Sequence, residues 1–211
     1  MSIDMKSRMR CAAVGALVCL ISMLGAGRAQ AVSYAEFSGN SGHSSWHDAV
    51  GSDYLIENFN DDTLNPGLEY TLIGANHHYA DTIDEGEFRD RVTPFVGSTL
   101  WTFETPIYAF GGFWDLTPNG PGTGINVYAG WLGPGWLGIG LIDNSFNGDF
   151  WGFVSDTPFT WVLLTAGGQS SGIQETYTLD NLHYAPVPEP GTMILLGSGV
   201  LGLALKRRRS A

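Results

Sequence analysis

Cysteine is nearly absent from this 211-residue chain, which has only Cys11 and Cys19. Both lie in the first 31 residues, so the rest of the chain cannot form a disulfide. Its stability must therefore come from a packed core or from bound metal. All seven tryptophans lie between residues 32 and 185, which is one domain's worth of chain and long enough to bury a sizeable core.

Basic residues are also rare away from the two ends of the chain. Of the ten lysines and arginines, four precede Val32 and four follow Leu205, which leaves only Arg89 and Arg91. Residues 32–188 carry nineteen acidic residues against these two basic ones, a net charge near −17. Such a surface repels nucleic acid and anionic membranes, so we expect neither as a partner, and it attracts divalent cations.

Long hydrophobic runs are missing as well. The C-terminal apolar run, Thr192 to Leu205, has 14 residues, fewer than the roughly 20 that span a bilayer as a helix. It follows Val187, Pro188, Glu189 and Pro190 and precedes Lys206, Arg207, Arg208 and Arg209. The basic cluster favours the cytoplasmic side. We therefore expect a single, transient anchor helix in the inner membrane, with the preceding domain outside.

These residues resemble the PEP-CTERM protein-sorting signal of exported proteins of Gram-negative bacteria. The resemblance lies in the order of a Pro-Glu-Pro box, an apolar stretch and a terminal basic cluster. It implies that an exosortase, a membrane-embedded transpeptidase-like enzyme, recognises and cleaves residues 186–211 during export to the cell surface.

The first 31 residues have the organisation of a secretory signal peptide. A positive segment with Lys6, Arg8 and Arg10 precedes an apolar run, and Ala29-Gln30-Ala31 forms an A-x-A cleavage site. We expect signal peptidase to cut there and the mature chain to begin near Val32. Cys19 lacks the surroundings of a lipidated cysteine, so both cysteines should leave with the signal peptide.

Residues 32–185 are expected to form a single antiparallel β-sandwich of jelly-roll type. Short apolar or alternating runs are separated by turn residues, with no helical periodicity over long stretches. A short helix is expected between Ser41 and Val50. The expected strands are Tyr54–Phe59, Leu68–Ile73, Glu87–Val92, Thr99–Glu104, Ile107–Phe113, Gly124–Ala129, Leu137–Ile142, Phe150–Val154, Phe159–Thr165 and Glu175–Tyr184.

The two ends of the sandwich suggest a calcium site. Residues 54–61 and 175–185 look like the opening and closing strands of many secreted jelly-roll modules, which pair with one another. Glu57 with Asp180 and Asn181 could then offer hard oxygen ligands to a structural Ca²⁺. In the alternative, Asp180 and Asn181 only bond to backbone groups at the edge of the sheet.

Other polar clusters give weaker signals. His43 and His47 are four residues apart, but no H-E-x-x-H pattern surrounds them, and the segment is rich in serine and glycine. We therefore assign neither them nor His183 as metal ligands. The acidic residues between 81 and 90 fit a solvated hairpin tip whose charge Arg89 and Arg91 offset. No pattern of a nucleophile, a paired-carboxylate site or a phosphate loop appears.

Aromatic residues are the best candidates for ligand contact. Trp131 and Trp136 flank a Gly- and Pro-rich turn, where exposed rings could stack on sugars. The other tryptophans considered, Trp101, Trp114, Trp151 and Trp161, are expected to fill the core.

We expect a non-enzymatic cell-surface or matrix protein associated with exopolysaccharide or biofilm. The alternative is a lectin-like carbohydrate-binding module, and the second alternative is a secreted hydrolase.

Overall fold

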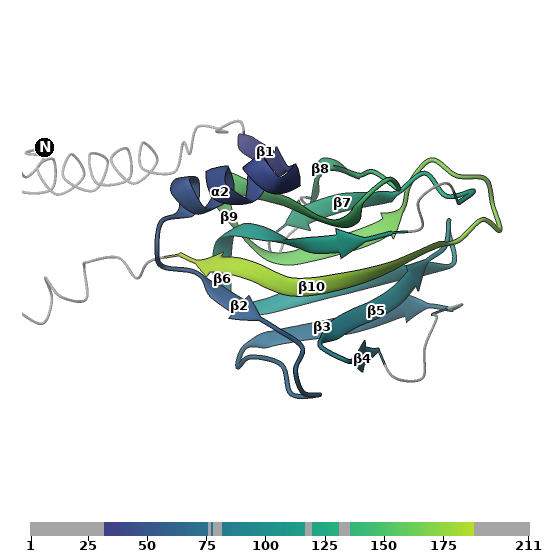
Figure 1. Ribbon diagram of the computed structural model, residues 1–211, viewed down its shortest axis with the longest axis horizontal. Helices are drawn as coiled ribbons and strands as arrows, with labels where there is room; N and C mark the ends of the chain where they lie inside the picture. The colour runs from purple at the N-terminus through teal and green to yellow at the C-terminus, as the bar shows by residue number, and fades with distance from the viewer. Residues whose placement is uncertain (1–31, 76, 78–81, 117–119, 131–135, 188–211) are drawn as a thin grey trace, which may run out of the picture. The chain divides into compact units, whose positions relative to one another are not determined.

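The computed structural model describes residues 32–75, 77, 82–116, 120–130 and 136–187 (Figure 1). The chain divides into two compact units, Met1–Val32 and Ser33–Ala211, and nearly all described residues belong to the second. The expected signal peptide and C-terminal anchor helix lie outside the described residues. Within them, no helix is both long enough and apolar enough to cross a membrane.

Ten strands and one helix build the described part of the chain. Helix α2 spans Gly39–Val50, which confirms the short helix expected there. The strands are β1 (Tyr34–Ser38), β2 (Leu55–Glu57), β3 (Leu68–Gly74), β4 (Ile83–Asp84), β5 (Glu87–Val92), β6 (Gly97–Asp115), β7 (Ile125–Gly130), β8 (Trp136–Ile142), β9 (Asn147–Ala166) and β10 (Glu175–Pro186).

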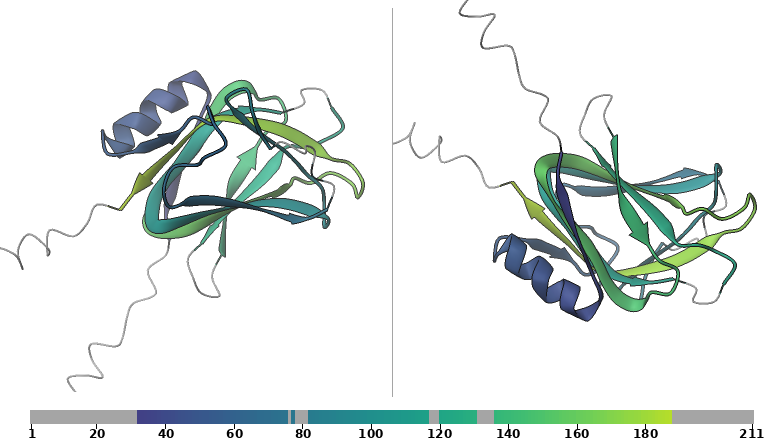
Figure 2. Two further views of the ribbon diagram at one scale, coloured as in Figure 1. Left: turned by 90° about the horizontal axis from the view of Figure 1, so that it is seen from below. Right: turned by 90° about the horizontal axis from the view of Figure 1, so that it is seen from above.

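All of the strand pairings are antiparallel, and two long strands pass through both layers of a sandwich. The first layer contains β5, β2, β10, the second half of β6, the first half of β9, and β1. The second layer contains β3, the first half of β6, the second half of β9, β7 and β8. Figure 2 shows the long strands curling from one layer to the other. The predicted antiparallel β-sandwich is confirmed.

The turn from one layer to the other occurs where the register of β6 and β9 breaks. Between Thr102 and Ala109 the two strands leave their regular pairing, and each carries a proline there, Pro106 and Pro158. Proline has no backbone N–H to donate, so it fits a point where the ladder is interrupted. Each long strand was expected as two separate strands, because polar residues and a proline divide its apolar pattern at this corner.

The core lies between the layers, and a second apolar cluster lies outside the first layer. Trp101, Trp114 and Trp151 are buried in the main core, as expected. Outside the first layer, α2 packs through Trp46 and Val50 onto Phe150 of β9 and neighbouring side chains. Helix α2 is therefore fixed on the outer face of the sheet (Figure 2).

A candidate ligand-binding groove

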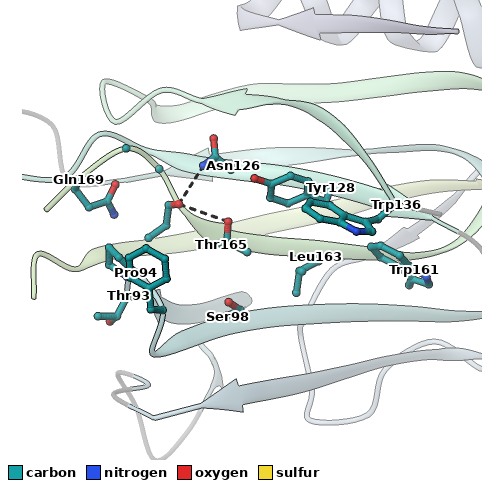
Figure 3. Close-up of a pocket in the computed structure, with 14 residues that line it drawn as sticks. Thr93, Pro94, Ser98, Asn126, Tyr128, Trp136, Trp161, Leu163, Thr165 and Gln169 are labelled. Atoms are coloured by element: carbon teal, nitrogen blue, oxygen red, sulfur yellow. Dashed lines mark hydrogen bonds between the residues drawn. The ribbon is translucent and has the colours of Figure 1, made fainter. Parts of the chain in front are cut away.

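A groove of about 710 Å³ opens on the outer face of the second layer. Residues of β6, β7, β8 and β9 form its floor and wall, and the loops at 93–95 and 167–169 close one end (Figure 3). Asn126 and Tyr128 point into it because they alternate along β7 with Ile125 and Val127, which face the core. The same alternation on β9 turns Leu163 outward between Val162 and Leu164.

Aromatic rings line the groove. Trp136 is 66% exposed, and its ring lies 5.0 Å from that of Tyr128 in an edge-to-face arrangement. Gly130 of β7 is paired with Trp136 on one side and with Trp161 on the other. Directly paired residues project from the same face of a sheet. Gly130 itself contributes no side chain between these two paired residues.

Polar groups gather at the end of the groove closed by the loops. The Asn126 amide donates to the Ala166 carbonyl over 3.1 Å, and the Thr165 hydroxyl donates to the same carbonyl over 3.4 Å (Figure 3). The Thr123 hydroxyl donates to Gln169 Oε1 over 2.8 Å. Gln169 Nε2 is buried and has no hydrogen-bond partner among the described residues. A ligand hydroxyl could satisfy this donor, which otherwise costs free energy to bury.

The described lining of the groove carries no charged side chain. None of its described lining residues is acidic, basic or histidine, in a domain whose surface is strongly acidic. Aromatic faces combined with amide and hydroxyl groups suit a neutral ligand that carries both C–H faces and hydroxyl groups.

The sequence predicted part of this site. Trp136, a candidate for sugar contact whose exposure the sequence left open, is exposed in the groove, whereas Trp131 lies outside the described residues. The expectation that Trp161 fills the core was wrong, because residues of β9 alternate between the core and the outer face, and Trp161 belongs to the outward set. Tyr128 was missed. Its place in the alternation of β7 was a usable signal, but the partner strands were unknown.

The expected calcium ligands do not share a site. The predicted pairing of the opening and closing strands is confirmed, with Glu57 of β2 opposite Leu182 of β10. Leu182 faces the core, so Glu57 does too, and it is only 4% exposed. Its carboxylate accepts from the backbone N–H groups of Phe59 (2.9 Å) and Asn65 (2.6 Å). Glu57 thus fixes the loop after β2.

Asp180 lies on the opposite face of β10 from Glu57. It is paired with Phe113, whose side chain packs with the cluster outside the first layer. Asn181, at φ +49°, lies in the bulge of β10 between Asp180 and His183, where the register with β6 shifts. These three residues therefore give calcium no common position, and calcium binding by the chain stays a prediction.

The acidic segment near residue 85 forms a hairpin between β4 and β5. Glu85 and Gly86 both have positive φ, which a two-residue hairpin turn requires. The Arg89 guanidinium lies 2.8 Å from Asp84, 3.4 Å from Glu85 and 3.3 Å from Glu87. The expected solvated tip is confirmed for Arg89, whereas Arg91 was expected to share this role and instead donates to the Thr176 hydroxyl over 3.4 Å. Asp90 differs from this expectation, because it is 1% exposed.

Few sorting-signal residues fall in the described part of the chain. Val187 is described, and its N–H donates to the Pro106 carbonyl over 2.9 Å. The remaining sorting-signal residues, from Pro188 to Arg209, and the cleavage-site residues Ala29 and Ala31 lie outside the described residues.

Solved structures that are similar to this chain include variants of a family 29 carbohydrate-binding module. One is 11% identical, with a TM-score of 0.47 over 64% of this chain and 92% of that one. A variant complexed with mannohexaose is 11% identical, with a TM-score of 0.46 over 63% and 90%. A variant complexed with cellulohexaose is 12% identical, with a TM-score of 0.45 over 63% and 89%.

The family comparison concerns the C-terminus. Residues 186–209 match the family model of the PEP-CTERM protein-sorting motif. No curated protein matches the chain.

Proposed function

We propose that this chain, an exported protein with a PEP-CTERM sorting motif processed by an exosortase, holds neutral polysaccharide at the cell surface or in the extracellular matrix. The groove on the outer face of the second layer is the proposed binding site, and the proposed role is non-enzymatic. The motif at residues 186–209 supports the export route, and the groove supports the binding.

The observation that carries the proposal is the aromatic pair across Gly130. Trp136 on β8 and Trp161 on β9 are both in register with this glycine, and Tyr128 lies beside Trp136. The C–H face of a pyranose ring packs well on an indole or phenol face, while its hydroxyls need donors and acceptors at the edge. Asn126, Thr165 and Gln169 supply such groups at one end.

The chemistry of the lining supports a binding role over hydrolysis. Glycoside hydrolysis generally uses two carboxyl groups that flank the scissile bond. The lining residues that the structure describes include no aspartate or glutamate.

The test is binding of the purified full-length protein, in mild detergent, to the exopolysaccharide of its own host. Trp136→Ala should weaken binding by about 2 kcal/mol, roughly thirtyfold in Kd, because buried tryptophan anchors dominate interfaces. Affinity electrophoresis through a polysaccharide gel measures the difference in mobility.

The matched control is Tyr34→Ala on β1, an aromatic that is also exposed but belongs to the first layer. It should bind as the native protein does. If the polysaccharide gel slows the Trp136→Ala variant as much as the native protein, the groove is not the binding site.

A further inference from the structure

We propose that His43, His47 and His183 form a binding site for one divalent transition-metal ion of the zinc type. The site lies outside the first layer, away from the groove, and is independent of the polysaccharide proposal. The nitrogen atoms that these three side chains offer all lie within 4.8 Å of one another.

Two of the ligands come from one face of α2. Residues 43, 46, 47 and 50 are the helix positions turned toward the sheet, as their burial shows. The Nε2 atoms of His43 and His47 are 2.7 Å apart, so both rings point to the same place. Two histidines four residues apart on a helix can bind one zinc ion.

The third ligand comes from β10, some 140 residues later in the sequence. His183 is 3% exposed, and its ring lies 5.4 Å from that of His43 and 5.5 Å from that of His47. Helix α2 lies against the outer face of the first layer (Figure 2), which brings the helix and the strand together.

A hydrogen bond sets the tautomer of His183. Its Nδ1 lies 2.5 Å from the carbonyl oxygen of Asn181, the residue at φ +49° in the bulge of β10. With the proton on Nδ1, Nε2 carries the lone pair that a metal needs. Metal-bound histidines commonly donate their other ring nitrogen to a backbone carbonyl in this way.

Two of the three rings are favoured as neutral imidazoles. Burial lowers the pKa of His183 to about 4, with the neighbouring histidines adding to the effect. Burial, and then the proximity of His47, lowers the pKa of His43. A metal ion therefore displaces few protons from these two rings near neutral pH.

The geometry needs only small side-chain rotations. In a tetrahedral zinc site with Zn–N distances near 2.0–2.1 Å, ligand nitrogens lie about 3.3 Å apart. The nitrogen atoms of His43 and His47 are closer than this, at 2.7 Å, and those of all three histidines lie within 4.8 Å of one another. Three nitrogen ligands favour zinc, copper or nickel over calcium, which prefers oxygen.

Aromatic side chains hold the rings in place. Phe113 and Phe150 contact His43 at 4.9 and 4.8 Å between ring centroids, and Tyr54 contacts both His47 and His183. The ion would join α2 to β10 and so stabilise a domain that has no cysteine to form a disulfide.

The test is a zinc titration of the full-length protein, purified without a polyhistidine tag and stripped with EDTA. Calorimetry should give one equivalent of Zn²⁺. Loss of a residue that only hydrogen-bonds to a metal ligand costs roughly 10- to 100-fold in affinity. His43→Gln and His47→Gln each remove a ligand itself, so each should weaken zinc binding by more than this. Both positions are partly exposed on α2, so thermal unfolding can show that the variants fold.

Asp48→Asn, an exposed change on the same helix, is the control for binding to the acidic surface and should leave the affinity unchanged. Co²⁺ should give the intense visible absorption of a tetrahedral complex. Absence of stoichiometric binding, equal affinity in the histidine variants, or a weak octahedral cobalt spectrum would each overturn the proposal.

Discussion

Among single residues, Asp90 has the least expected environment. It is buried, and its carboxylate accepts from the Thr99 hydroxyl over 2.5 Å and lies 3.0 Å from His77 Nδ1. The Tyr177 hydroxyl in turn donates to Thr99 Oγ1 over 2.8 Å. A buried carboxylate is tolerated when such bonds satisfy it. The position of Asp90 in an acidic run gave no sign of this, because its partners are Thr99 of β6 and His77 of the segment after β3.

The Tyr177 hydroxyl should resist ionisation. Burial first, and then the charge of Asp90, raises its pKa well above the ordinary value of 10.0. Above pH 10 the unfolded chain loses this proton while the folded chain keeps it, so the free energy of unfolding should fall as pH rises. Tyr177→Phe should lower the free energy of unfolding by about 1 kcal/mol at pH 7. The same change should reduce the further fall in this free energy above pH 10.

Ultraviolet absorbance of tyrosinate during alkaline titration, together with urea unfolding of both proteins, checks this prediction. Loss of the Tyr177 proton near pH 10, in protein that is still folded, would contradict it.

At the level of elements, paired glycines leave room for the Phe150 ring on the outer face of the first layer. Gly111 of β6 and Gly152 of β9 are directly paired. A Cβ on Gly111 would lie 2.8 Å from the Phe150 ring and 3.0 Å from the Gly152 Cα atom. The first distance is shorter than real Cβ contacts, and the second, which involves backbone, is tighter than most of them.

Gly111→Ala should therefore lower the free energy of unfolding by about 1–3 kcal/mol, the usual cost of overpacking. Gly138→Ala on β8 is the matched control, since its Cβ would meet Tyr128 no closer than 3.6 Å. That change should stay within about 0.5 kcal/mol. Urea unfolding measures both, and equal destabilisation by the two changes would refute the packing argument.

The strands themselves were largely predictable. Residues Glu87–Val92 were expected as a strand and form β5 with the same bounds, because alternation and flanking turns mark both ends. The short strands β1 and β4 were missed. β1 precedes the helix with mostly exposed residues, and β4 has only two residues, so neither gives an apolar pattern.

For the whole molecule, the site was harder to predict than the fold. Trp136 could be proposed because it flanks a turn, but its neighbours Tyr128 and Trp161 join it only through the strand register. The histidines show the same limit. His43 and His47 had the spacing of ligands, and it is the packing of α2 onto β10 that adds His183.

The overall charge predicts which ligands the groove accepts. Residues 32–188 have a net charge near −17, whereas the described lining of the groove is uncharged. Binding to a neutral polysaccharide should thus change less than about twofold between low and high salt. Binding to an acidic polysaccharide should be weaker and should improve as salt screens the repulsion. Affinity electrophoresis at two salt concentrations compares them, and tighter binding of the acidic polymer at low salt would contradict the charge argument.

The most direct test of the groove as the binding site is chemical footprinting of the tryptophans. The native protein is oxidised with N-bromosuccinimide, with and without the host's exopolysaccharide, and the modified peptides are quantified by mass spectrometry. Trp136 should react readily in the free protein and be protected by the polysaccharide, while the buried Trp46 and Trp101 stay unmodified in both samples. Oxidation of Trp136 at the same rate in both samples, with the polysaccharide bound, would contradict the account.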